Sequence, residues 1–97
     1  MFIHMISFKY KDSVDAAARA DHWASLRALR DIEGILDLQV GGDVVRGPRS
    51  FDAGLLIIFR DRAAHDAYQK HPRHVPIGQA GASFCESVVA ADFEGTV

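Results

Sequence analysis

The sequence predicts a single α+β domain in which one antiparallel sheet of four strands carries its helices on one face. Three observations support this prediction. Four segments have the composition of strands, helical segments separate them, and the order along the chain is β-α-β-β-α-β. The 97 residues are 48% hydrophobic and 25% charged, so residues 1–97 suffice for one core and are expected to form one domain.

The first strand is predicted over residues 2–10, FIHMISFKY, because apolar side chains occupy both alternating faces. Ser13 is then expected to cap a helix that runs to about Glu33, and Gly34 to end it. Residues 35–42, ILDLQVGG, alternate again and predict a second strand with Leu36 and Leu38 on one face. The polar stretch GDVVRGPRS predicts a loop or loose hairpin.

The second half of the chain starts with FDAGLLIIFRD, a strongly β-prone strand. Asp61 or a neighbour is expected to start a short helix, RAAHDAYQKH, and Pro72 suits the first turn of a further helical piece capped by His71. Gly78 and Gly81 are expected to loosen the chain before CESVVAADF forms the last strand. This is the split βαβ order of ferredoxin-like domains.

Helices on one face leave the other face of such a sheet bare. Leu56, Ile58, Met5 and Val89 are expected to lie there, and a second copy of the chain is the simplest cover for them. A homodimer through the exposed sheet face is therefore predicted.

Composition excludes several partners. The net charge of −2 comes from 11 basic and 13 acidic residues spread along the chain, which argues against nucleic acid. The longest apolar run, AGLLIIF, is far below the roughly 20 residues that span a bilayer, and no leader pattern opens the sequence, so a cytoplasmic protein without membrane contact is expected. Cys85 is the one cysteine, so an intrachain disulfide and a cysteine-based zinc site are excluded, and it is expected to be a small buried hydrophobe.

Four segments carry a resemblance to a known family: IHMISFKYKD, ILDLQVGGDV, FDAGLLIIFRDRAAHDAYQKHPRH and VVAADFE. Together they resemble the stress-responsive A/B barrel (Dabb) domains over nearly the whole chain. The resemblance implies a homodimer whose two sheets close a barrel, with a separate pocket in each protomer between sheet and helices. Some members are plant stress proteins, and one member type, olivetolic acid cyclase, closes a polyketide ring by an aldol reaction. By similarity to that cyclase, His74 would be catalytic, Tyr68 an active-site tyrosine and His4 a supporting histidine.

The residues themselves allow the same chemistry. Strand alternation places His4 on the face that the helices cover, where His74 and Tyr68 could converge with it on one apolar cavity. A neutral histidine could take a proton from the carbon beside a carbonyl, and Tyr68 could donate to the developing negative charge. The residues expected to contact substrate are His71, Ile6, Phe8, Trp23, Leu55, Ile57 and Val88.

Structural roles are the alternative for the same residues. His71 could cap a helix, His74 could bond to a carbonyl, and Tyr68 could be a core residue. His22 is expected to be partly buried and His65 to lie on the surface, neither with a partner predicted. No cofactor is predicted. A metal on His71 and His74 is not expected, because Pro72 disrupts the i, i+3 helical geometry, and a haem site has still less support.

Departures from the cyclase pattern argue against its substrate. Ala53 stands where the cyclase has a further histidine, Cys85 where it has a tryptophan, and its first-helix aromatic residues are only partly matched. Three functions stay open: a dimeric acid–base cyclase, lyase or isomerase acting on a carbonyl-containing or polyketide-like compound, a non-catalytic ligand-binding or stress-response dimer, and a structural dimer whose pocket its own side chains fill.

Overall fold

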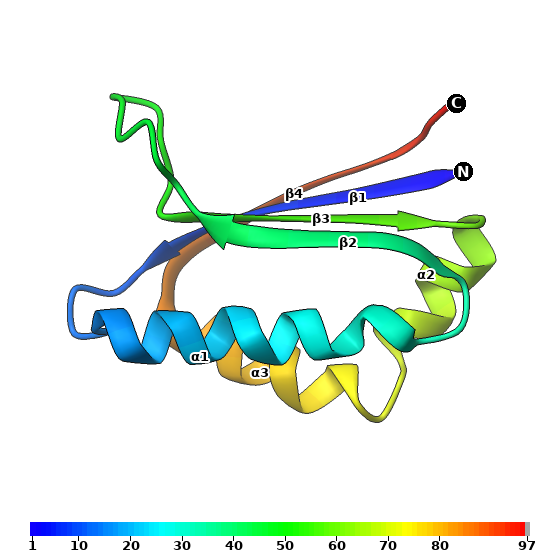
Figure 1. The fold of residues 1–97 in the computed structure, drawn as a ribbon, viewed down its shortest axis with the longest axis horizontal. Coiled ribbons are helices and arrows are strands. Elements are labelled where there is room, and N and C mark those ends of the chain that lie inside the picture. The colour runs from blue at the N-terminus through cyan, green and yellow to red at the C-terminus, as the bar shows by residue number, and fades with distance from the viewer. Residues whose placement is uncertain (97) are drawn as a thin grey trace.

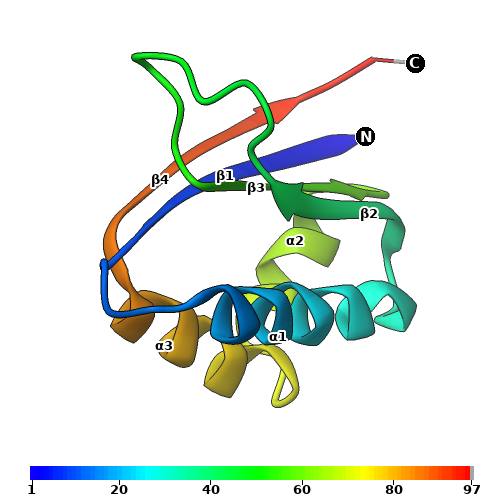
Figure 2. The same ribbon diagram turned by 60° about the vertical axis from the view of Figure 1, so that its left-hand side comes forward.

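The predicted order of elements is confirmed, including the further helical piece after Pro72, and a 3₁₀ helix that was not predicted follows the first helix. The structure is a computed structural model that describes residues 1–96. The sheet order is β2-β3-β1-β4 with every pair antiparallel, and the helices lie together on one face of the sheet (Figures 1 and 2). The elements are β1 (Phe2–Tyr10), α1 (Ala16–Arg27), a 3₁₀ helix (Ala28–Asp31), β2 (Ile35–Gly42), β3 (Ala53–Phe59), α2 (Arg62–Gln69), α3 (His74–Phe84) and β4 (Cys85–Glu94).

Helix α1 begins later than predicted. Asp15, and not Ser13, is its N-cap, since the Asp15 carboxylate accepts a hydrogen bond of 2.9 Å from the amide of Ala18. The α-helix also ends earlier, at Arg27, and one 3₁₀ helix continues to Asp31. Gly34 has a φ of +91°, which allows the turn into β2, and an added Cβ would lie 2.5 Å from the Cβ of Ala64.

The second helical region divides into α2 and α3. Asp61 caps α2 as predicted, accepting from the amide of Ala64 at 2.8 Å. The predictions for α3 were wrong in two respects. Its N-cap is Arg73 and makes no side-chain capping bond, and Gly78 and Gly81 do not interrupt it, because α3 runs through both as far as Phe84.

The register of the strands sorts their side chains between the two faces. His4 pairs with Ile57 on β3 and with Asp92 on β4, so the even-numbered residues of β1, and those of β4 from Val88 to Glu94, face the helices. A register shift before Tyr10 brings Cys85 to the same face. A register shift between Ile35 and Asp37 breaks the alternation of β2, which leaves Leu36 exposed rather than on the face of Leu38. The buried residues of this face form the core; its sheet residues are Phe2, Phe8, Tyr10, Leu38, Ala53, Leu55, Ile57, Phe59 and Cys85.

The opposite face of the sheet is apolar and uncovered, as predicted. Met5 and Val89 are 45% and 49% exposed, and Leu56 and Ile58 are half-buried beside them. Phe93, which follows Val89 and Ala91 on the same side of β4, is also exposed. No helix in residues 1–96 is long and apolar enough to cross a membrane, and the cytoplasmic location stays a prediction.

Candidate active site

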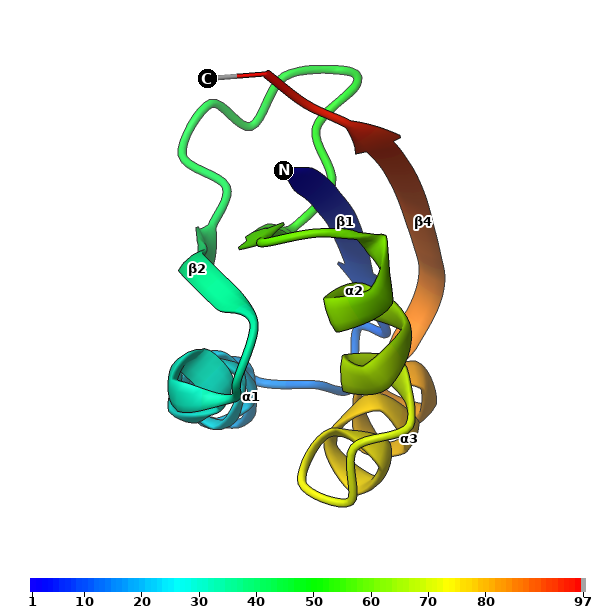
Figure 3. The same cartoon turned by 90° about the vertical axis from the view of Figure 1, so that its right-hand side faces the viewer.

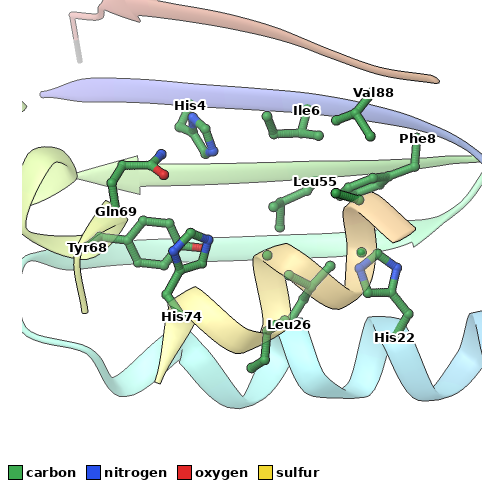
Figure 4. Close-up of a pocket in the computed structure, with 14 residues that line it drawn as sticks. His4, Ile6, Phe8, His22, Leu26, Leu55, Tyr68, Gln69, His74 and Val88 are labelled. Atoms are coloured by element: carbon green, nitrogen blue, oxygen red, sulfur yellow. The ribbon is translucent and has the colours of Figure 1, made fainter. Parts of the chain in front are cut away.

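A cavity of about 240 Å³ lies between the sheet and the helices. In Figure 3, α1 lies below β2 and α3 lies on the side of β4, with α2 above α3 and nearer the strands. The middle of the cavity is apolar and its ends are polar (Figure 4). Its apolar wall consists of Ile6, Phe8, Leu26, Leu55, Ile77 and Val88.

The three predicted catalytic residues meet at one end of this cavity. His4 comes from β1, Tyr68 from the end of α2 and His74 from the start of α3, and Figure 4 shows His4 directed toward the other two. The rings of Tyr68 and His74 pack with their centroids 4.2 Å apart, and those of His4 and Tyr68 are 6.3 Å apart. Their spatial convergence follows the prediction, while their catalytic role stays a proposal.

Asp92 is the partner of His4, and the sequence analysis missed it. Its carboxylate Oδ1 bonds to Nδ1 of the His4 ring across the β1–β4 pair. A carboxylate on Nδ1 holds the proton there and leaves Nε2 of His4 for the cavity. The signal was present in the sequence, since Asp92 is the polar residue of VVAADF that shares the helix-facing side with Val88, but only the register pairs it with His4.

Burial determines the protonation states of His74 and Tyr68. It lowers the pKa of His74 below its ordinary value, and the backbone of Gln69 only partly offsets this effect. Nδ1 of His74 is buried without a hydrogen-bond partner among residues 1–96. Burial also raises the pKa of Tyr68, which is 1% exposed, so that its phenol remains a proton donor at neutral pH.

The far end of the cavity holds a second polar group that was not predicted. His22 is 5% exposed and has a partner that was not predicted: its Nδ1 lies 2.6 Å from the hydroxyl of Tyr10. The indole N–H of Trp23 donates to the same hydroxyl at 2.9 Å. Burial lowers the pKa of His22 and raises that of Tyr10 to about 12.

His65 is not a surface histidine, because its ring packs against those of Phe2 and Phe59 beside His4. Its Nδ1 lies 3.1 Å from Asp66. Among residues 1–96, one group could hold a metal ion: the ligand atoms of His4, His65 and Asp92 lie within 4.8 Å of one another. In this geometry Asp92 is engaged directly by His4, with Nε2 of His65 3.8 Å away.

Ile6, Phe8, Leu55 and Val88 line the cavity as expected of substrate-binding residues. The other three candidates, Ile57, Trp23 and His71, lie outside the lining.

Ile57 is fully buried in the core. The indole N–H of Trp23 donates a hydrogen bond to the hydroxyl of Tyr10, and the indole ring lies against Gly42. His71 is in the turn before α3, where its carbonyl accepts from the amides of His74 and Val75 and its Nδ1 accepts from Arg73. These positions favour the structural role of His71 over substrate contact.

The fold and the site define a class: a ferredoxin-like α+β domain with a ligand-sized cavity between its sheet and its helices, lined by histidines and a tyrosine. The chain belongs to the stress responsive A/B barrel domain family, whose model matches residues 2–95. No curated protein matches the sequence.

Several solved structures share this fold. A dimeric protein of ferredoxin-like fold from Bacteroides fragilis is 25% identical with a TM-score of 0.81, covering 97% of this chain and 95% of its own. A dimeric ferredoxin-like protein from Thermobifida fusca is 22% identical with a TM-score of 0.87, covering 95% and 88%. The hydroxynitrile lyase from Passiflora edulis is 18% identical with a TM-score of 0.84, covering 95% and 90%.

Proposed function

We propose that this protein is a homodimeric acid–base enzyme, acting without a cofactor, that removes a proton from a small carbonyl compound in a reaction of the cyclase, lyase or isomerase type. The observation that carries the proposal is the Asp92–His4 pair at the polar end of an apolar cavity. An oriented imidazole beside a protonated phenol is the combination that proton abstraction next to a carbonyl requires.

His4 is the general base in this proposal. Asp92 fixes the ring with its proton on Nδ1, so that Nε2 is the basic atom, and the carboxylate stabilises the imidazolium that forms. The sequence-based assignment gives the role of base to His74 and a supporting role to His4. A variant of Asp92 separates the two assignments, because Asp92 bonds to His4 and has no bond to His74.

Tyr68 is the proton donor to the substrate oxygen. Its raised pKa keeps the phenol protonated, and its ring packs against His74, whose lowered pKa keeps the imidazole neutral. As the base removes the proton, the carbonyl oxygen gains negative charge, which a fixed hydroxyl stabilises. The apolar wall would hold the hydrocarbon part of the substrate, which favours an aromatic or polyketide-like compound.

The hydroxynitrile lyase from Passiflora edulis supports the choice of reaction class. Cleavage of a hydroxynitrile removes the hydroxyl proton, breaks the bond between carbon and the nitrile group, and yields a carbonyl compound and hydrogen cyanide, so it also needs a base. The likeness of that lyase to this chain lies in the fold, so it guides the choice of test compounds and not the identity of the substrate.

A dimer completes the proposal. The outer face of the sheet exposes Met5, Val89 and Phe93, and apolar surface of this kind favours a partner. The neighbours from Bacteroides fragilis and Thermobifida fusca are dimeric, which supports a second copy of this chain as that partner.

The test measures exchange of the α-protons of acetophenone in D₂O by proton NMR, and release of benzaldehyde from mandelonitrile. We expect the wild-type protein to accelerate one of the two reactions above the buffer rate. Asp92→Asn should lower that rate by about 10²-fold to 10⁴-fold, and Tyr68→Phe by a comparable factor.

The possible results of this test distinguish the alternative assignments. If Asp92→Asn retains the full rate and His74→Ala abolishes it, His74 is the base and His4 is not. If the wild-type protein binds these compounds without changing them, the protein is a non-catalytic ligand-binding dimer. The cavity, which the protein's own side chains leave open, already counts against a purely structural dimer.

A further inference from the structure

His22 occupies the end of the cavity opposite His4. It projects from α1, and its ring stands edge-on to Phe8, with centroids 5.0 Å apart. His4 and Phe8 are four residues apart on β1, which is about 13 Å along a strand. Figure 4 shows His4 and His22 at opposite ends of the lining, with Ile6 and Leu55 between them.

The hydrogen bonds around His22 fix its tautomer. The indole nitrogen of Trp23 is a donor only, so the hydroxyl oxygen of Tyr10 must accept from it. The single hydroxyl proton of Tyr10 is then free to be donated to Nδ1 of His22, 2.6 Å away. The reverse arrangement would leave that proton without an acceptor among residues 1–96. His22 is therefore a neutral imidazole with its proton on Nε2.

That Nε2–H group is a donor without a protein acceptor in residues 1–96. It lies against α3 at Gly81, where an added Cβ would be 2.8 Å from Nε2. Glycine at position 81 is thus what makes room for the imidazole at the cavity wall. Since no protein group in residues 1–96 accepts from this donor at the cavity wall, a ligand that supplies an acceptor here gains affinity.

We infer that the cavity takes an elongated, uncharged ligand with two oxygen acceptors joined by an apolar segment, one accepting from the hydroxyl of Tyr68 beside His4 and the other from Nε2–H of His22. The ligand is uncharged because no Lys, Arg, Asp or Glu lines the cavity. The length of the apolar segment follows from the wall between the two ends, which suits one aromatic ring. This inference rests on the proposed function for the identity of the first end, but it requires no turnover.

The test compares two compounds of the same shape, 1,4-diacetylbenzene and 4-ethylacetophenone, which differ in the second carbonyl. Binding is measured by calorimetry or by NMR titration of the full chain. We expect the diketone to bind the wild-type protein about threefold to tenfold more tightly, the effect of one additional neutral hydrogen bond. His22→Phe should abolish the preference, and His22→Gln, which keeps an N–H donor, should retain part of it.

Two further measurements keep the inference falsifiable. Ser25→Ala, one turn along α1 and exposed, is the control and should keep the wild-type preference. Long-range ¹H–¹⁵N NMR spectra should show His22 protonated on Nε2, and Tyr10→Phe should weaken both this tautomer and the preference for the diketone.

Equal affinities in the wild-type protein, a preference that survives in His22→Phe, or no binding of either compound up to its solubility would overturn the inference. A separate result would refute the proposed function. If the diketone preference holds while neither α-proton exchange nor benzaldehyde release is catalysed, the ligand class stands and the catalytic proposal falls.

Discussion

Acidification below about pH 6.5 is expected to destabilise this fold, because His22 and His74 are held neutral inside it. Burial lowers the pKa of both side chains, whereas in the unfolded chain a histidine titrates near 6.5. Between the folded and unfolded pKa values the unfolded chain binds more protons than the folded one. The free energy of unfolding is therefore fully present above about pH 6.5 and falls as the pH drops toward the folded pKa values.

Each of these histidines contributes a slope of up to about 1.4 kcal/mol per pH unit within that window, so together they contribute up to about 2.7. A domain of this size has a total stability of about 5–15 kcal/mol, so one unit of acidification removes a substantial part of it. Asp52 does not contribute to the pH dependence of stability in this window. Its desolvation acts to raise its pKa, but hydrogen bonds from the amide of Tyr10 and from Arg46 lower it overall, and its effect falls below pH 4.

The assay is urea unfolding at half-unit steps from pH 5 to 8, at one protein concentration because a dimer's stability depends on it. His22→Gln and His74→Gln should each reduce the slope by about half, and the double variant should remove most of it. His71→Gln, in the turn before α3, is the control. A double variant with the wild-type slope, or a protein that gains stability on acidification, would refute the reasoning.

Three further predictions follow from the same structure. Gly81→Ala should lower the free energy of unfolding by about 1–3 kcal/mol in thermal or urea unfolding, because its Cβ would meet His22, whereas Gly41→Ala meets nothing within 4 Å and should be neutral within about 0.5 kcal/mol. Val89→Glu on the outer face of the sheet should convert the dimer to a monomer in light scattering, while Val44→Glu in the exposed β2–β3 loop should not; a dimeric Val89→Glu protein would place the interface elsewhere. Dialysis against EDTA should leave the α-proton exchange rate unchanged within about twofold, and a loss that Zn²⁺ restores would instead assign His4, His65 and Asp92 to a metal.

The strands could be predicted because their signal is local. Alternation in FIHMISFKY and the β-branched run AGLLIIF gave β1 and β3 close to their observed bounds. Helix boundaries were harder, because Ser13 and Asp15 are both competent N-caps and only the fold selects Asp15. Leu36 was misplaced because a register shift in β2 cannot be read from alternation alone.

The site was predictable where the family resemblance or strand alternation reached it. His4, Tyr68 and His74 meet at the cavity as the resemblance implies. Asp92 and Tyr10 were missed, since each acquires its role through a partner that is distant in sequence: Asp92 through the β1–β4 register, and Tyr10 through a side chain of α1. Pairings of this kind depend on tertiary structure and leave no periodic pattern in the chain.

The composition of α3 reflects the space that two histidines need beside the cavity. Gly78 and Gly81 both line it from the middle of a helix, where each glycine costs about 1 kcal/mol relative to alanine. A Cβ at Gly81 would meet His22, and one at Gly78 would lie 3.3 Å from Nε2 of His74. Both glycines thus leave room for an imidazole at the cavity wall. Because alanine is the more stable residue within a helix, the two glycines are explained by the room that the two imidazoles need at the cavity wall.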